Sequence, residues 1–287
     1  MNDIAYLNGE FIKRDQAKVS IEDRGFQFGD SIYEVIKLYD GQLFALERHL
    51  HRMLKGINRI DINFNYNLEE LKKICKQVIK KNQDYPKSKS GSLYIQVTRG
   101  SAPRSHGFTS DLEPTIIMYL LPTKEYSQEL RKEGAAAITM PDRRWELCSV
   151  KSTNLLPNIL SKQEAKEKGV IEALFVADNK KITEGSSSNV FIVNEGVVKT
   201  SPATDDILNG ITRSIILDLD YYDFVVREEK FSLNDLYDAD EVFITSTTKE
   251  VLGIVEIDDK KINNGRVGPI TQKIHQKFKN YLNEYLD

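Results

Sequence analysis

The sequence predicts a two-domain fold of the α/β (α+β) class, and three observations lead to that prediction. Its 287 residues are enough for one large domain or two smaller ones. Segments with apolar residues at every second position alternate with segments that carry them at helical spacing. A polar break at residues 122–126 separates the two halves. We therefore expect a smaller N-terminal α/β domain at 1–121, an interdomain linker at 122–126 and a larger C-terminal domain at 127–287.

The N-terminal half opens with a hairpin signal. Asn8-Gly9 stands between Ile4–Leu7 and Phe11–Lys13, and Asn-Gly supports the positive φ angles that a two-residue turn needs. Asp40-Gly41 repeats the signal between Tyr33–Tyr39 and Leu43–Leu46. Two amphipathic helices are expected next, carrying Leu46, Leu50, Met53, Leu54 and Ile57, and then Leu68, Leu71, Ile74, Cys75, Val78 and Ile79. A loop at Pro86–Gly91 and the strands Leu93–Thr98 and Thr115–Leu121 complete this half.

The C-terminal half mixes apolar runs and amphipathic segments in the same way. Expected strands are Ala136–Met140, Ala173–Ala177, Val190–Val193 and Val242–Ser246. Expected helices are Pro157–Lys168, Gly210–Leu219 and a closing helix from Ile270 to Tyr285.

Composition excludes several classes of function. The net charge is −3 and the basic residues are spread along the chain, so no footprint for nucleic acid is expected. Cys75 and Cys148 make neither a disulfide framework nor a metal-site spacing. No apolar run approaches the ~20 residues that span a bilayer, and the N-terminus lacks the pattern of a signal peptide. We expect a cytoplasmic protein without a metal, a membrane or a nucleic-acid partner.

The densest chemical signal begins at Lys151, which follows a short apolar run and precedes Leu155-Leu156. A lysine that enters a partly buried, Leu-rich setting suits Schiff-base chemistry. Most lysines are simply solvated, so this residue alone proves nothing. Downstream, the turn Thr183–Asn189 contains Glu184, an acid that suits a cationic ring nitrogen. The same turn alone is equally typical of a polar connection before a strand.

Two further motifs suit a phosphate group. Leu208–Arg213 passes through Gly210 into an apolar helix, and a helix start offers free backbone N–H groups to an anion. Thr245–Thr248 follows a strand with hydroxyls and amides that complete such a site. Taken alone, the first pattern is more often an ordinary loop-to-helix junction and the second an ordinary turn.

Taken together and in this order, the four motifs resemble fold-type IV pyridoxal-phosphate-dependent enzymes, from about Ile4 to the C-terminus. The resemblance implies a two-domain fold with pyridoxal 5'-phosphate between the domains, held by the C-terminal one. It implies that Lys151 is catalytic and carries the cofactor as a Schiff base. It also implies a set of further cofactor-binding residues: Glu184, Arg52, Leu208, Gly210, Ile211, Thr212, Ser246 and Thr247. Arg48 is an alternative to Arg52, which the register favours, and Glu34 is expected near Lys151 without an assigned role.

The first half is similar to the D-amino-acid aminotransferase branch of that family. The segment 22–35 contains Tyr33, and 97–106 contains Arg104 and His106. In the branch, matching residues bind the substrate α-carboxylate, the Arg and His being delivered by a neighbouring subunit. A guanidinium grips a carboxylate bidentately, and Tyr and His add donors. Without the family context, Arg104 and His106 suit a solvated loop better.

The resemblance therefore implies a homodimeric transaminase that moves the amino group of D-alanine, or another D-amino acid, to 2-oxoglutarate. The products are pyruvate and D-glutamate. The sequence departs from the family in two places. The segment Asp218–Asp238 matches loosely, though it carries no expected cofactor ligand, and Pro157 stands where smaller residues are expected, which concerns specificity more than class. Three alternatives stay open: a branched-chain L-aminotransferase, an aminodeoxychorismate lyase and a non-enzymatic cofactor-binding protein.

Overall fold

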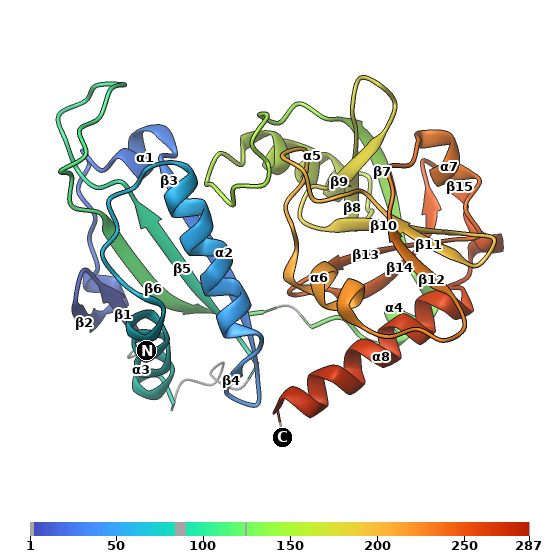
Figure 1. The fold of residues 1–287 in the computed structure, drawn as a ribbon, viewed down its shortest axis with the longest axis horizontal. Coiled ribbons are helices and arrows are strands. Elements are labelled where there is room, and N and C mark those ends of the chain that lie inside the picture. Colours follow the sequence, from blue (N-terminus) through green and yellow to red (C-terminus); the bar gives the residue numbers. More distant parts are fainter. Residues whose placement is uncertain (1–2, 84–89, 124, 287) are drawn as a thin grey trace. The chain divides into compact units, whose positions relative to one another are not determined.

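The computed structural model describes residues 3–83, 90–123 and 125–286, and the chain divides into two compact units (Figure 1). The first contains Met1–Thr123, Val150–Asn154 and Leu286, and the second contains Lys124–Ser149, Leu155–Tyr285 and Asp287. The segment with Lys151 thus groups with the N-terminal unit, which no sequence boundary marks. Most of the loop expected at Pro86–Gly91 lies outside the described residues, as does Lys124 in the expected linker.

The N-terminal unit is built on an antiparallel sheet with the strand order β2-β1-β6-β5-β3-β4 (Figure 1). Its strands are β1 (Ile4–Leu7), β2 (Glu10–Lys13), β3 (Ser31–Tyr39), β4 (Gln42–Leu43), β5 (Ser92–Thr98) and β6 (Thr115–Leu121). Its helices are the 3-10 turn Arg14–Gln16, α1 (Arg24–Phe28), α2 (Leu46–Arg59) and α3 (Leu68–Lys81). The predicted first hairpin is confirmed, since Asn8 and Gly9 have φ angles of 46° and 96°.

Helices α2 and α3 cover one face of this sheet, and both were predicted from their apolar spacing. Helix α2 packs against β3 and α3, and α3 packs against β1 and β6 (Figure 1). Leu50, Met53 and Ile57 are buried on α2. Burying each such side chain contributes about 1.5–3 kcal/mol. A capping box of Asn67 and Glu70 starts α3 by satisfying N–H groups that the first turn leaves without partners.

The strand predicted at Leu43–Leu46 is wrong beyond its first residue. Strand β4 ends at Leu43, and Leu46 begins α2. Between them Ala45 has a φ angle of 52°, a left-handed conformation that ends an extended segment. Leu46 is buried as the first apolar residue of the helix, so the tertiary packing outweighs its place in a short strand pattern.

The C-terminal unit is built on a mixed sheet with the order β12-β11-β10-β13-β14-β7-β8-β9, and β15 pairs with β14. Its strands are β7 (Ala135–Pro141), β8 (Glu172–Val176), β9 (Ile182–Gly185), β10 (Asn189–Asn194), β11 (Val197–Thr200), β12 (Val225–Glu228), β13 (Glu241–Ser246), β14 (Glu250–Ile257) and β15 (Lys260–Lys261). Its helices are α4 (Gln128–Glu133), α5 (Leu156–Glu167), α6 (Ile211–Asp218), α7 (Leu233–Tyr237), the 3-10 turn Asn263–Gly265 and α8 (Pro269–Leu286). The turn between β9 and β10 brings β9, at one end of the sheet, into contact with β10, the third strand from the other end.

Buried apolar side chains from several strands form the main core cluster of this unit. Leu174, Ile192, Ile244 and Leu252 are buried in it, from four different strands. Helix α5 packs against β7 and β8, and α6 against β13 (Figure 1). The predicted strands and helices of this half are all present with small shifts at their ends, whereas α4, α7, β9, β11, β12, β14 and β15 were not predicted.

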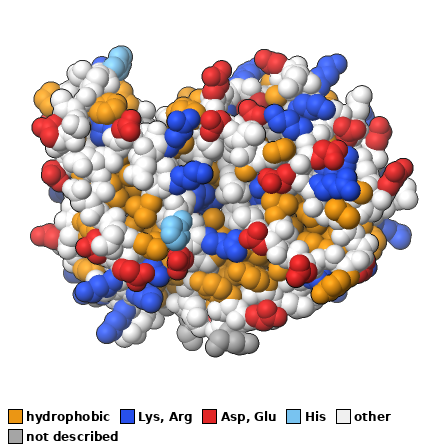
Figure 2. All heavy atoms as spheres, viewed as in Figure 1, with side chains coloured by type: hydrophobic (Ala, Val, Ile, Leu, Met, Phe, Trp, Pro, Cys, Tyr) orange, Lys and Arg blue, Asp and Glu red, His pale blue; other side chains and the backbone are white. Residues whose placement is uncertain are grey.

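Charge, helix length and cysteine state can be described for the part of the chain that the structure covers. On the face drawn in Figure 2, basic and acidic side chains are interspersed. Among the described residues, no helix is long and apolar enough to cross a membrane. The same residues contain no group of His, Cys, Asp and Glu side chains that is arranged to hold a metal ion, and both cysteines are free thiols.

Candidate functional site

Lys151 lies on a short segment that is fastened to the beginning of β3. The backbone N–H of Tyr33 donates to the carbonyl oxygen of Lys151 at 2.9 Å. The N–H of Thr153 donates to the carbonyl of Ser31 at 3.1 Å, and the hydroxyls of the same two residues hydrogen-bond at 2.6 Å. These hydrogen bonds fix the backbone at and beside Lys151. A side chain that must reach a reactive atom requires such a fixed backbone position.

The side chains of Lys151 and Tyr33, both predicted site residues, lie against each other. Lys151 Nζ is 4.3 Å from the centroid of the Tyr33 ring, within the range of a cation–π interaction. The Tyr33 ring in turn stacks on Tyr94, with 6.0 Å between centroids. The lysine is half-buried, so its amine is partly shielded from water and still reachable.

The next residue of β3, Glu34, holds Arg52 of α2. Arg52 donates Nε to Glu34 Oε1 at 2.7 Å and Nη2 to Oε2 at 2.8 Å. His49 Nδ1 lies 2.8 Å from Oε2, and it must be the donor because a carboxylate only accepts. Although burial alone would raise it, Arg52 and His49 hold the pKa of Glu34 well below its ordinary value. Glu34, left without a role by the sequence, is therefore an ionised anchor for Arg52.

Arg104 and His106 lie on an exposed loop between β5 and β6. The Arg104 guanidinium is 5.1 Å from the Phe28 ring, and the His106 ring meets Phe28 edge-on at 5.6 Å. Within one chain, no hydrogen bond or ring contact among the described residues joins either side chain to Tyr33 or Lys151. The predicted carboxylate-binding residues thus fall into two groups in a single copy of the N-terminal unit.

In the C-terminal unit, the carboxylate of Glu184 is buried and surrounded by donors. It forms an ion pair with Arg144 and accepts from Asn189 Nδ2 at 3.2 Å and from the backbone N–H of Leu208 at 3.1 Å. Arg144 also donates to both oxygens of Asp142, at 2.9 and 2.7 Å. Despite burial, which acts in the opposite direction, these acids raise the pKa of Arg144, so the pair is ionised.

Asn189 joins the Glu184 turn to the start of α6. Besides Glu184, its amide donates to the carbonyl of Leu208 at 2.8 Å. A Cβ atom at Gly210 would lie 2.1 Å from Asn189 Oδ1, so only glycine allows this approach. Gly210 precedes α6, whose first turn has no side-chain cap. The predicted residues Leu208, Gly210, Ile211 and Thr212 thus form one continuous path to the helix start, where backbone N–H groups suit an anion.

Ser246 and Thr247 lie at the end of β13, the strand against which α6 packs. Thr245 is paired with Asn189 across the sheet, so the two side chains lie on the same face. The Thr245 hydroxyl is buried without a hydrogen-bond partner in the described structure. A buried polar atom without a partner costs free energy unless a ligand or water satisfies it.

A second buried carboxylate, Glu172 of β8, fixes the serines that follow Glu184. Lys249 Nζ donates to Glu172 Oε2 at 2.9 Å, and Ser187 and Ser188 donate to the same oxygen at 3.0 Å. Ser186 donates to the other oxygen. Although burial acts against it, Lys249 and the other donors lower the pKa of Glu172 to about 2. The serine turn is thereby tied to an ionised group in the core.

The sequence did not single out Arg144, Glu172 or Lys249, and it gave Asn189 no role of its own. Glu172 carried one signal, an acid at the start of the apolar run that becomes β8. Arg144 lies in an irregular segment after β7 and offers no pattern, because Glu184, the predicted site residue that it contacts, is 40 positions away in the sequence.

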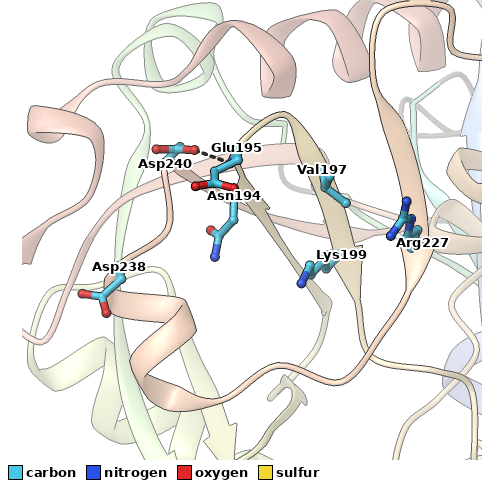
Figure 3. Close-up of a pocket in the computed structure, with 7 residues that line it drawn as sticks. All are labelled: Asn194, Glu195, Val197, Lys199, Arg227, Asp238 and Asp240. Carbon is cyan, nitrogen blue, oxygen red and sulfur yellow. Dashed lines mark hydrogen bonds between the residues drawn. The ribbon is translucent and has the colours of Figure 1, made fainter.

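A pocket of about 500 Å³ lies elsewhere in the C-terminal unit and contains none of the predicted site residues (Figure 3). Its walls include Glu195, Lys199 and Asp240. The backbone N–H of Glu195 donates to Asp240 at 2.7 Å, and Lys199 is ion-paired with Glu229. Because none of the predicted site residues lines this pocket, the candidate chemistry is assigned to the groups around Lys151 and Glu184.

Known proteins are similar to this chain in sequence and in fold. A model of the family amino-transferase class IV matches residues 31–257. The D-alanine aminotransferase of Staphylococcus aureus (strain N315) is 40% identical over 98% of both chains, and that of Bacillus licheniformis is 42% identical over 96% of both. A crystal structure of the branched-chain amino acid aminotransferase of Escherichia coli is similar with a TM-score of 0.90 and 27% identity, covering 98% of this chain and 95% of that one.

Proposed function

Because the chain belongs to the amino-transferase class IV family, whose members use pyridoxal phosphate, we propose that it is a D-alanine aminotransferase. It transfers the amino group of D-alanine, or of another D-amino acid, to 2-oxoglutarate and yields pyruvate and D-glutamate. The observation that carries this proposal is the 40% identity over 98% of both chains with a D-alanine aminotransferase. The cytoplasmic location expected from the sequence stays a prediction.

The residues of the C-terminal unit fit the cofactor. The uncapped start of α6 after Gly210 suits the phosphate, and the partnerless Thr245 hydroxyl beside Ser246 and Thr247 supplies a donor there. Arg52 of the N-terminal unit adds a cation to the proposed phosphate ligands. Glu184, ionised and held by Arg144, suits a protonated ring nitrogen, and Leu208 suits the ring face. The set offers a cation, amides and hydroxyls for the phosphate and an acid for the ring.

Lys151 is the proposed catalytic residue. Pyridoxal phosphate, when bound, supplies an electron sink that stabilises negative charge at the substrate Cα. Lys151 Nζ would hold the cofactor covalently, and after release its free amine would take the proton from the substrate Cα as a general base and deliver it to C4′ of the cofactor as a general acid. Tyr33, in contact with Lys151 at 4.3 Å, limits the positions that the free amine can adopt. The ionised Glu184 would keep the ring nitrogen of the bound cofactor protonated.

Tyr33, Arg104 and His106 are the proposed ligands of the substrate carboxylate. Since Arg104 and His106 have no contact with Tyr33 within one chain, the proposal includes a homodimer in which the loop serves the site of the neighbouring copy. Ile21, Phe26 and Phe108 are 80%, 78% and 47% exposed, and such apolar side chains near the loop suit burial against a second copy.

A branched-chain L-aminotransferase is the second candidate, and the fold similarity to the Escherichia coli enzyme favours it. The D-alanine aminotransferases are closer in sequence, at 40–42% against 27% identity.

The deciding experiment is an absorbance titration of the purified, cofactor-loaded protein with D-alanine and with L-alanine. Conversion of the cofactor band by D-alanine alone supports the proposal. Conversion by branched-chain L-amino acids instead identifies the second candidate. Pyruvate release from aminodeoxychorismate without an amino acceptor identifies a lyase, and a band that no amine changes identifies a cofactor-binding protein without transaminase activity.

A further inference from the structure

The loop that carries Arg104 and His106 has little regular structure of its own. Residues 102–114 contain no strand or helix, and the side chains from Pro103 to Asp111 are exposed. Its backbone begins with a bridge between Ser101 and Asp23 and a hydrogen bond from Ala102 to the carbonyl of Glu22. Beyond these two contacts, another part of the chain must hold the segment in one conformation.

The buried side chain of Arg24 hydrogen-bonds to the centre of this loop, and buried Arg99 lies 3.5 Å from the ring centroid of Phe108 in it. Arg24 of α1 donates Nη1 to the carbonyl oxygen of Ser105 at 2.6 Å and to that of Gly107 at 3.3 Å. Its Nη2 donates to the carbonyl of His106 at 3.1 Å. Three successive carbonyls therefore converge on one guanidinium, a charge-assisted arrangement that the planar fork of arginine suits and the point charge of lysine does not.

Arg24 is itself fixed by an acid and a second arginine. Its Nε donates to Asp30 Oδ2 at 2.9 Å. Arg99 approaches the same carboxylate through Nε at 2.8 Å and Nη2 at 3.0 Å, and it also donates to the carbonyls of Ile60 and Asp61 at 2.7 Å. Although burial acts in the opposite direction, both arginines hold the pKa of Asp30 below its ordinary value. The Arg24 side chain is only 5% exposed, so this support is built into the unit.

The same helix also orients the two side chains of the loop. Phe28, four residues after Arg24, contacts Arg104 at 5.1 Å, His106 at 5.6 Å and the Arg24 guanidinium at 4.9 Å. Arg24 thus binds the backbone of the loop, while Phe28 contacts the side chains of Arg104 and His106. One short helix sets both the position and the direction of Arg104 and His106.

We propose that Arg24 is a positioning residue that presents Arg104 and His106 to the carboxylate of the substrate. The inference rests on the proposed function, in which those two residues bind the carboxylate. A preordered loop binds the carboxylate without the entropic cost of ordering it at each encounter. Misplacing a binding group by about 1 Å costs up to ~100-fold in rate or affinity. Arg24 therefore affects substrate binding while touching neither substrate nor cofactor.

The test combines three variants of the holoenzyme with single-turnover measurements of the half-reaction with D-alanine. Arg24→Lys keeps the charge beside Asp30 and loses the fork. We expect it to raise the apparent dissociation constant for D-alanine by roughly 10- to 100-fold and to change the maximal rate by less than about 3-fold. Arg14→Lys is the matched control, because Arg14 also pairs with an acid and lies over an aromatic ring of the same unit, away from the loop.

Arg104→Ala is the third variant, and its combination with Arg24→Lys tests the route of the effect. If Arg24 acts through the loop, the two changes are less than additive: the double variant binds D-alanine more tightly than the product of the two single effects predicts, because only the contribution of His106 is left for Arg24→Lys to remove. Full additivity would overturn the proposal. Hydrogen exchange adds a readout independent of turnover: amides of residues 101–110 should exchange at least about 10-fold faster in Arg24→Lys, with those of β5 and β6 unchanged.

The outcomes separate the two proposals. If Arg104→Ala leaves the dissociation constant unchanged, the carboxylate site itself is wrong, and the role of Arg24 falls with it. If Arg104→Ala weakens binding and Arg24→Lys does not, or if exchange in the loop is unchanged, only the role of Arg24 is wrong. Unchanged circular dichroism and cofactor affinity exclude a general loss of folding. Should Arg24→Lys fail to fold, Phe28→Leu, which removes the aromatic contact of Arg104, gives the same comparison.

Discussion

Arg52 and Glu34 form a bidentate ion pair in the N-terminal unit, with Nε–Oε1 and Nη2–Oε2 distances of 2.7 and 2.8 Å. Glu34 is fully buried and directly follows Tyr33, and its Oε2 also lies 2.8 Å from His49. An ionised carboxylate that is buried costs much free energy when it loses partners such as these. The pair therefore connects the strand that carries Tyr33 to the helix that carries the proposed phosphate ligand.

Glu34→Gln should destabilise the protein and weaken cofactor binding together. It removes the buried carboxylate that pairs with Arg52, whose side chain is only 13% exposed, and breaking such a pair on one side costs up to about 3–5 kcal/mol. Urea denaturation should show a lower free energy of unfolding, and the dissociation constant of pyridoxal phosphate should rise. Glu47→Gln is the control: its pair with Lys72 is exposed, and a change below about 0.5 kcal/mol is expected. Equal stability of the two variants would contradict the role of Glu34.

Lys151→Ala should abolish both covalent attachment and turnover. Removing a positioned acid–base group alone costs ~10²- to 10⁴-fold in rate. Borohydride reduction of the native holoenzyme, followed by peptide mass spectrometry, should place the pyridoxyl group on Lys151. Lys168→Ala, at an exposed position on the surface, should keep both properties. A label on any other lysine, or full activity of Lys151→Ala, would disprove the assignment.

Sequence patterns predicted those elements whose information is local. Helix α2 and helix α3 follow from apolar spacing, and the first hairpin follows from Asn8-Gly9. Strand β14 lies inside its sheet between β13 and β7 and was not predicted. Gly253 in its middle weakens a strand pattern, and in the fold it admits Val267, which would lie 2.9 Å from a Cβ atom there. That requirement comes from a distant residue and leaves no local trace.

The candidate site also contains residues that local sequence patterns predict and residues that they do not. Residues in compact motifs, such as Glu184 and Gly210, were identified together, because each motif lies within a few consecutive positions. The sequence patterns missed the residues that support these motifs. Arg24 hydrogen-bonds to Ser105 and Arg144 to Glu184, and these partners lie 81 and 40 positions away in the sequence. Only the fold reveals such support, since helical or strand periodicity says nothing about pairings over long sequence separations.

Glu184→Gln should reduce catalysis far more than cofactor binding. Asn189, Leu208 and Arg144 still surround the side chain, and Arg144 keeps its pair with Asp142. The negative charge that we propose faces the ring nitrogen is lost, and removing one such electrostatic group costs ~10²- to 10³-fold in rate. Single-turnover rates with D-alanine measure this loss, and equilibrium dialysis measures cofactor affinity. Glu164→Gln on α5 is the exposed control, and a Glu184→Gln enzyme with native rates would refute the role of the charge.

Glu172→Gln should make the free energy of unfolding of the C-terminal unit less dependent on pH in the acidic range. The pKa of Glu172 is lowered from 4.5 to about 2, so the unfolded chain binds this proton more readily. The stabilisation from this group is therefore complete at neutral pH, begins to disappear as the pH falls below about 5, and is gone near pH 2. Over the whole window the effect is on the order of 3 kcal/mol, of which about 1 kcal/mol is lost between pH 7 and pH 3.5.

Urea denaturation of the wild type and Glu172→Gln at both pH values measures this difference, with sucrose added where acid alone unfolds the protein. At pH 7 the variant should be clearly less stable, because Lys249 becomes a buried cation without its counter-charge. At pH 3.5 the gap should narrow. Glu172→Gln combined with Lys249→Met removes both charges and should recover part of the stability. A gap that stays constant between the two pH values would mean that Glu172 is not the ionised anchor of the serine turn.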